Sequence, residues 1–101
     1  MTDLVEKNRG QLQKLCKKYD IKNMYLFGSA TSEKFKDSSD IDILISFQEI
    51  PYDEYTDNYF ELHEELEKLF DRKVDLVTER SLSNPFFKES VEESKQLLYA
   101  A

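Results

Sequence analysis

Residues 24–47 read MYLFGSATSEKFKDSSDIDILISF, and this stretch decides the fold. Its first four residues are apolar and end at Gly28, which fits a buried strand and is too short for a helix. Residues 29–39 are almost entirely polar, so we expect a loop there. Residues 40–47 alternate between two kinds of side chain, as the two faces of a strand do. The stretch therefore predicts two strands joined by a polar loop.

The alternation within 40–47 predicts which side chains share a face. Successive residues of a strand point to opposite sides of the sheet. The core face should receive the isoleucines at 41, 43 and 45 together with Phe47. The opposite face should carry Asp40, Asp42, Leu44 and Ser46.

The flanking sequence adds helices and a third strand. Apolar residues recur at helical spacing over 3–20 and again over 52–70, while the apolar run 74–77 predicts a strand. Asn84 before Pro85 is typical of a helix start, with an N-cap and a proline at the first helical position. The buried face of this last helix is expected to include Phe87, Val91 and Leu98.

Three strands make a small sheet that needs helices for its core. We therefore expect a single α/β (α+β) domain over residues 1–101, a two-layer fold with a small mixed sheet and helices packed on one side. The chain has 101 residues, 40% of them hydrophobic. It lacks the roughly 20-residue apolar run of a membrane span, and nothing at its start resembles a signal peptide. A cytoplasmic protein is the expectation, with Cys16 as a buried structural thiol.

Charge limits the partners that the protein can bind. The net charge is -7, from 14 basic and 21 acidic residues, which disfavours binding to nucleic acid and its phosphates. The charges are also unevenly spread, because residues 49–67 hold eight carboxylates and no Lys or Arg. This segment suits a polar partner surface, although a solvated helix face explains it equally well.

Two aspartates on one strand face indicate a metal site. Residues i and i+2 of a strand lie about 6.5 to 7 Å apart on the same side, so Asp40 and Asp42 can bind the same hard cation through oxygen. Gly28 lets the backbone approach a ligand, and Ser29 adds a hydroxyl and an amide, so this turn can hold the phosphates of a nucleoside triphosphate. Asp75 interrupts the apolar run 74–77 and is the candidate for a third carboxylate. Such a site suits nucleotidyl transfer with magnesium.

The sequence resembles the minimal nucleotidyltransferases of the DNA polymerase β superfamily. Their signature is a Gly-Ser followed at a set interval by Asp-x-Asp, and here Gly28-Ser29 precedes Asp40-Ile41-Asp42 by ten residues. The segments MYLFGS, SSDIDILISF and KVDLVT fit that pattern. So does LSNPFFKESVEESKQLLYA, which resembles the family's closing helix.

The resemblance implies a function in detail. It implies magnesium held by Asp40, Asp42 and Asp75 as catalytic residues, and ATP bound at Gly28 and Ser29. It also implies transfer of AMP to a hydroxyl, expected to be a tyrosine, of a HEPN-type toxin for which the protein is the antitoxin. Many relatives carry Arg-Gly shortly after the Gly-Ser, whereas residues 30–33 read ATSE. The triphosphate is then expected to be bound by Lys34 or Lys36, or to be bound more weakly.

Alternatives remain open at this point. A catalytically inactive antitoxin that only binds its partner would keep the same fold. A small-molecule nucleotidyltransferase of the aminoglycoside-modifying kind would need an extra domain. The acceptor, the base and the oligomeric state are not determined by the sequence. His63 is expected to pack or face solvent, and Tyr52, Tyr55 and Tyr59 to be core or half-buried residues.

Overall fold

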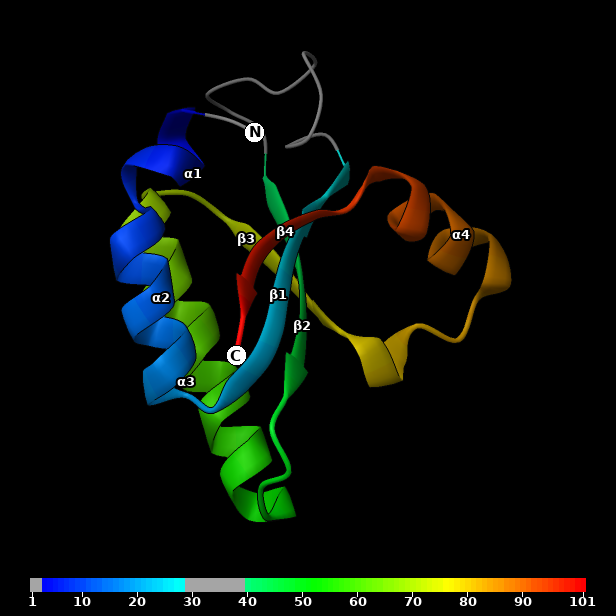
Figure 1. The fold of residues 1–101 in the computed structure, drawn as a ribbon. Coiled ribbons are helices and arrows are strands. Elements are labelled where there is room, and N and C mark those ends of the chain that lie inside the picture. The colour runs from blue at the N-terminus through cyan, green and yellow to red at the C-terminus, as the bar shows by residue number, and fades with distance from the viewer. Residues whose placement is uncertain (1–2, 29–39) are drawn as a thin grey trace.

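The computed structural model describes residues 3–28 and 40–101 (Figure 1). The helices are α1 (Asp3–Lys7), α2 (Arg9–Lys18), α3 (Tyr52–Phe70) and α4 (Pro85–Ser94), with a 3-10 turn, η2, at Glu79–Ser81. The strands are β1 (Ile21–Phe27), β2 (Ile41–Phe47), β3 (Val74–Thr78) and β4 (Gln96–Ala100). None of the helices in the described part of the chain could span a membrane.

The four strands form one mixed sheet in the order β3-β2-β1-β4. β1 runs antiparallel to both of its neighbours, while β2 and β3 are parallel. The parallel pair is connected through α3, the crossover helix that such a pair requires. This arrangement confirms the predicted mixed sheet, with β3 and β4 at its two edges.

The C-terminal strand β4 corrects the sequence-based prediction. The last helix was expected to continue through Leu98, but it ends at Ser94, and Lys95 leaves the helical region at φ −64° and ψ 140°. Leu98 is buried as expected, yet it belongs to β4, and Phe87 is 43% exposed. The spacing of Phe87, Val91 and Leu98 fits a helical stripe, and only pairing with the distant β1 shows that the last of them belongs to a strand.

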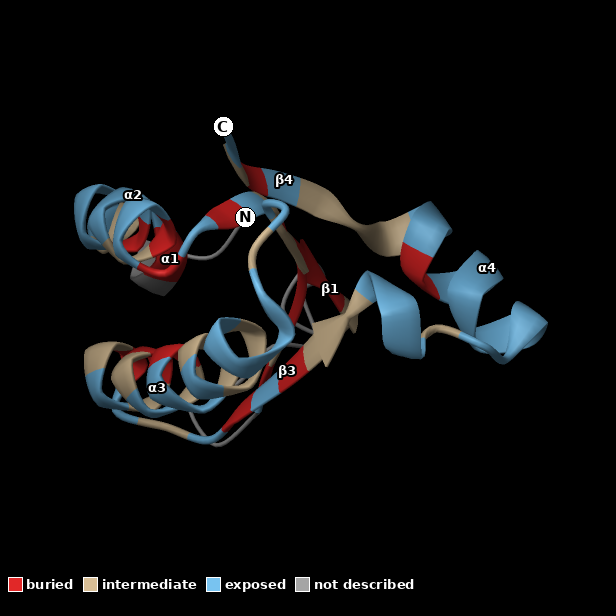
Figure 2. Ribbon diagram, turned by 90° about the horizontal axis from the view of Figure 1, so that it is seen from below, coloured by how far each residue is buried: buried red, intermediate tan, exposed pale blue. Residues whose placement is uncertain are grey.

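The two faces of the sheet are covered differently (Figure 2). α2 and α3 cover one face, and the main core there contains Ile41, Ile43 and Ile45, each fully buried. α4 lies over the other face, where a second, smaller cluster joins Phe27, Leu44 and Val91. Leu44 and the isoleucines therefore point in opposite directions, which confirms the predicted alternation along β2.

The helices begin and end close to where the sequence places them. α3 spans 52–70 as expected, whereas the predicted helix 3–20 is interrupted at Asn8 and forms α1 and α2. The Asn84 side chain accepts hydrogen bonds from the backbone N–H groups of Phe86 and Phe87, with Pro85 as the first residue of α4. The predicted N-cap is therefore confirmed. Cys16 is buried, and burial raises the pKa of its thiol to about 12, which keeps it unreactive.

Candidate active site

The parallel pairing of β2 and β3 brings two of the predicted aspartates together. Asp42 lies directly opposite Asp75 in the register of these strands. Paired residues of neighbouring strands share a face of the sheet, about 4.8 Å apart across the strands. Asp42 shares its face with Leu44, so both carboxylates lie on the α4 side of the sheet. The pairing confirms the sequence-based placement of Asp75 beside Asp42.

Gly28 lies next to the Asp42 carboxylate, on the β1 side of β2, opposite to the β3 side that carries Asp75. β1 pairs antiparallel with β2, and Phe27 is the register partner of Asp42, so Gly28 follows at the strand exit. Its φ of +68° is a left-handed conformation that glycine adopts readily. A Cβ at this position would overlap Asp42 Oδ2 and would lie 3.3 Å from Asp42 Cγ. Glycine is therefore required both by the turn and by the space that the Asp42 carboxylate occupies.

The charges of three aspartates act on one another. Burial, followed by the charges of Asp75 and Asp40, raises the pKa of Asp42 to about 6 from an ordinary value of 3.8. Asp42 is half-buried, whereas Asp40 and Asp75 are exposed. Like charges that raise the pKa of a neighbouring carboxylate in this way occupy one electrostatic site. The structure thus places Asp42 opposite Asp75 and within electrostatic reach of Asp40, at one end of the β2–β3 pair.

Other predicted contributors to the site lie outside the described residues. Ser29, the second half of the proposed phosphate-binding turn, is one of them, as are Lys34, Lys36 and the segment 30–33 where relatives carry Arg-Gly. The described part of the site is therefore Gly28 and the three aspartates. It therefore offers a glycine at the end of a strand and three carboxylates, whose oxygens could bind a ligand.

These residues fit a hard divalent cation. Carboxylate oxygens are the ligands that magnesium prefers, and a bound cation would favour the ionised form of Asp42 against both the burial and the like charges that raise its pKa. Within residues 3–28 and 40–101, no three His, Cys, Asp or Glu side chains are gathered closely enough to form a preformed metal site. Carboxylates that repel one another stay apart without a counter-ion. The donor set is thus of the kind that a hard divalent cation binds.

α4 is tied to the site by contacts that sequence reasoning missed. The backbone N–H of Gly28 donates to Ser94 Oγ at 3.3 Å, and Ser94 Oγ in turn donates to the Ser90 carbonyl oxygen. The rings of Phe27 and Phe87 meet edge to face, with their centroids 6.0 Å apart. The closing-helix segment was recognised in the sequence, but no local signal indicates that its last serine hydrogen-bonds a glycine 66 residues away.

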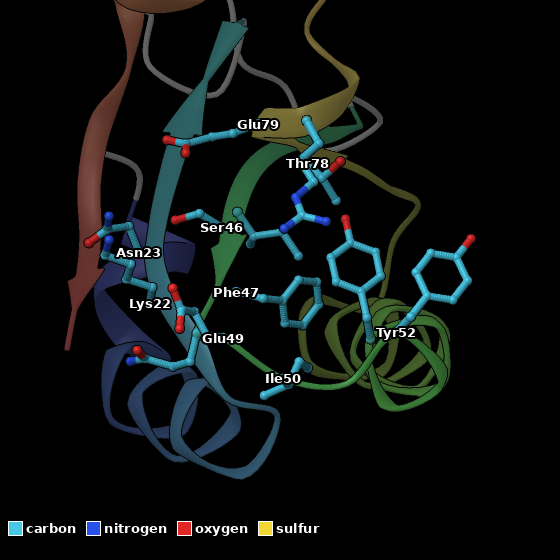
Figure 3. A pocket seen from close by; sticks show the side chains of 13 residues that line it. Lys22, Asn23, Ser46, Phe47, Glu49, Ile50, Tyr52, Thr78 and Glu79 are labelled. Atoms are coloured by element: carbon cyan, nitrogen blue, oxygen red, sulfur yellow. The ribbon is translucent and has the colours of Figure 1, made fainter.

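A pocket of about 470 Å³ lies at the far end of β2 from the aspartates (Figure 3). Ser46, Phe47 and Glu49 line it from β2 and the following turn, and Tyr52 lines it from α3. Ser46 is four residues beyond Asp42, about 13 Å along an extended strand. This pocket is therefore separate from the aspartate site.

Sequence comparison gives the family. The profile of the family described as polymerase beta, nucleotidyltransferase matches residues 10–101. A chain of Methanocaldococcus jannaschii, described as a candidate protein adenylyltransferase, is 45% identical over 76 residues, 75% of each chain. The protein adenylyltransferase MntA of Thermococcus cleftensis is 35% identical over 81 residues, which cover 80% of this chain and 79% of the relative.

Structural comparison agrees with the sequence. A solved structure described as a candidate minimal nucleotidyltransferase superimposes with a TM-score of 0.76 at 28% identity, covering 94% of this chain and 95% of that one. A chain of a toxin–antitoxin crystal structure with AMP-PNP gives a TM-score of 0.72 at 27% identity, covering 93% and 74%. A chain from the complex of a tri-AMPylated Shewanella oneidensis HEPN toxin with an MNT antitoxin superimposes with a TM-score of 0.67 at 25% sequence identity. The match covers 96% of this chain and 73% of that one.

The family model matches residues 10–101, which is nearly the whole chain, and the relatives and solved structures agree with it. The chain therefore belongs to the polymerase β nucleotidyltransferase family and is one of its minimal nucleotidyltransferases.

Proposed function

We propose that this protein transfers AMP from ATP to a hydroxyl group, most simply a tyrosine, of a partner protein, and that the partner is a HEPN-type toxin which this modification silences. The observation that carries the proposal is the pairing of Asp42 with Asp75 beside a glycine that leaves room for the Asp42 carboxylate. Relatives with protein adenylyltransferase names and toxin–antitoxin structural neighbours support the choice of acceptor.

Each residue has a distinct part in this proposal. Asp40, just before β2, and Asp42, within β2, would hold magnesium together with Asp75 from β3. Ser29 would bind the β- and γ-phosphates through its hydroxyl and its backbone N–H, and Gly28, which has no side chain, would let the phosphates come close to the backbone. Bound magnesium would neutralise charge on the phosphates and orient them.

The reaction itself is a displacement at the α-phosphorus. The bond from the acceptor oxygen to the α-phosphorus forms, the bond from the α-phosphorus to the bridging oxygen breaks, and pyrophosphate leaves. The acceptor proton passes to a nearby carboxylate, for which the candidate is Asp75, an exposed residue on the edge strand β3. Positioning and charge neutralisation supply most of the rate enhancement in such transfers.

Mass spectrometry of the partner tests the proposal. The wild-type protein, incubated with the HEPN-type chain encoded beside it, ATP and magnesium, should add one or more AMP units to that chain. The double variant Asp40→Ala and Asp42→Ala should add none, and both proteins should melt as folded domains. A partner that stays unmodified by the wild type, yet is inhibited equally by both, supports the binding-only antitoxin instead. Extension of a labelled RNA would replace the protein acceptor by nucleic acid.

Calorimetry separates nucleotide binding from transfer. Asp42→Asn removes one charge from the site while keeping the size of the side chain. We expect it to lower the magnesium-dependent affinity for ATP at least tenfold, because a charged oxygen ligand is lost. Equal affinity in both proteins would remove Asp42 from the metal site.

A further inference from the structure

A shallow groove of about 300 Å³ runs along the outer edge of β3, immediately after Asp75. Leu76, Val77 and Thr78 form its strand side. Ser81 closes it beyond the strand, and four residues of α3 form its opposite wall: Tyr55, Thr56, Tyr59 and Phe60. The groove therefore begins one residue beyond a proposed catalytic aspartate and ends near η2.

Aromatic rings give this groove an apolar wall that is open to solvent. Phe60 is 64% exposed although it is a large apolar side chain, and its ring meets that of Tyr59 edge to face at 5.3 Å. Burial and the charge of Asp75 raise the pKa of Tyr59, so the hydroxyl end of this wall lies within electrostatic reach of the active site. An exposed aromatic ring beside a concave surface is typical of a binding site for another apolar group.

The backbone edge of β3 is already occupied by side chains. Tyr59 donates its hydroxyl to the Leu76 carbonyl oxygen at 2.5 Å, and His63 Nε2 lies 2.7 Å from the Val74 carbonyl oxygen. The Val74 N–H donates to Glu67 Oε2 at 2.9 Å, and Ser81 Oγ donates to the Thr78 carbonyl oxygen at 2.8 Å. An added strand would need these groups of the edge. A ligand in the groove must therefore be recognised through a side chain and not by strand pairing.

The surface around the groove is acidic. The part of α3 that supplies the aromatic wall lies within the segment 49–67, which has eight carboxylates and no Lys or Arg. Asp57 and Glu61 flank the wall and are exposed. A partner that approaches this wall is favoured when it is basic, because charge complementarity speeds encounter and selects the partner. On the strand side, the Arg80 guanidinium lies over the Tyr55 ring, 5.6 Å from its centroid.

We propose that the groove receives an aromatic or large aliphatic side chain from a Lys- and Arg-rich segment of the acceptor protein, and that this anchor directs the acceptor hydroxyl to Asp75. The inference rests on the proposed function for the identity of the acceptor. An extended chain advances about 3.3 Å per residue. A hydroxyl-bearing residue two or three positions from the anchor can therefore reach past the edge strand β3 to the aspartates on its other side. Phe60 is a docking residue in this scheme and takes no part in chemistry.

A titration without ATP or metal tests the groove independently of transfer. The probe is a 12-residue peptide of lysine, glycine and serine with one phenylalanine. Its binding is measured by NMR, as chemical-shift changes of the isotope-labelled protein. We expect saturable shifts at the backbone amides of Val77 and Thr78. The variant Phe60→Ser should weaken binding at least fivefold, since an exposed aromatic anchor commonly carries that much of an interface. Tyr52→Ser is the matched control, because Tyr52 lies on the same helix, is 81% exposed and does not line the groove. It should change affinity less than twofold.

Three outcomes would overturn the inference. They are equal binding of a peptide with serine in place of phenylalanine, shifts centred on α4 that Phe86→Ser abolishes, and a titration with no saturable shifts at all. Because no nucleotide is present, none of them bears on whether the aspartates transfer AMP. Conversely, a protein that binds the peptide as expected but leaves its partner unmodified retains the groove and loses the proposed reaction. With an active enzyme, Phe60→Ser should raise the KM for the acceptor and leave the KM for ATP unchanged.

Discussion

The two faces of β2 differ in what they contribute to the protein. On one face, Ile41, Ile43 and Ile45 are fully buried beneath α2 and α3. On the other, Leu44 belongs to a three-residue cluster under α4, and Asp42 stands half-buried beside it. Stability comes mainly from the first face, because most of the buried apolar area is there. The second face can therefore accommodate repelling carboxylates, which the large core could not.

The largest expected effect separates these faces at adjacent residues. Ile43→Asp places an unpaired charge in the main core, which commonly costs several kcal/mol, comparable to the whole free energy of unfolding of a small domain. We expect this variant to be unfolded at 25 °C by circular dichroism. Asp42→Asn, one residue away, should remain folded with a cooperative melt. The reverse order would place the aspartates on the core side.

The second prediction concerns Gly28, at the end of β1 beside the Asp42 carboxylate. An alanine there would take a left-handed conformation and would overlap the Asp42 carboxylate. We expect Gly28→Ala to lower the free energy of unfolding by about 2 kcal/mol and to abolish magnesium-dependent ATP binding. Gly10→Ala is the control, because it lies in α2 with nothing within 4 Å of an added Cβ.

That control should raise stability by about 0.5 to 1 kcal/mol, as glycine to alanine usually does inside a helix. Adding Asp42→Ala to Gly28→Ala should recover part of the loss by removing the overlapping group. Additive losses in the double variant would show that the backbone conformation alone accounts for the cost, without the carboxylate.

Much of this contrast was predictable from the sequence. The alternation of isoleucine and aspartate gives the register of β2, and Asn84-Pro85 gives the start of α4, since both signals are local. β4 was missed because QLLYA becomes a strand only through pairing with β1, whose paired residues lie at least 70 positions earlier in the sequence. The Tyr52 ring was expected to be at least half-buried but is 81% exposed, because it lies in the first turn of α3 beyond the sheet.

The candidate site shows the same division between local and distant information. Asp40, Asp42 and Asp75 were identified from their positions on predicted strands, and the pairing of β2 with β3 brings the last two together. The contact between Gly28 and the Asp42 carboxylate and the hydrogen bond to Ser94 could not be predicted. They depend on how far β1 extends along β2 and on where α4 returns to the sheet.

The third prediction concerns the pH dependence of the aspartate face. Asp42 has a pKa of about 6 in the folded protein against 3.8 ordinarily. The folded state is thus favoured while this carboxyl is protonated, and that advantage is lost as pH rises from about 4 to 6. The shift corresponds to about 3 kcal/mol, which partial exposure reduces to about 1 to 2 kcal/mol.

Asp42→Asn should therefore be more stable than the wild type by about 1 to 2 kcal/mol at pH 8 with a chelator, and equally stable near pH 3.5. Chemical denaturation at both pH values measures the difference. Excess magnesium at pH 8 should reduce it, because the cation stabilises the ionised wild-type site. An asparagine variant that is no more stable at pH 8 would show that neither burial nor the charges of Asp75 and Asp40 disfavour ionised Asp42 in the folded protein.

The smallest expected effect lies in α4, the helix that lies over the aspartate face of the sheet (Figure 2). α4 buries a single residue, Val91, so its first turn depends strongly on its cap. Asn84→Ala removes the acceptor of the Phe86 and Phe87 N–H groups and should cost about 1 kcal/mol. Because so little of α4 is buried, this loss should appear as faster amide exchange at the start of the helix, with little change in the melting temperature. Asn84→Asp keeps an acceptor oxygen in the same place and should restore slow exchange. A melting temperature lowered as much as by a core truncation such as Ile43→Val would mean that α4 unfolds together with the main core, and the two faces would then form one cooperative unit.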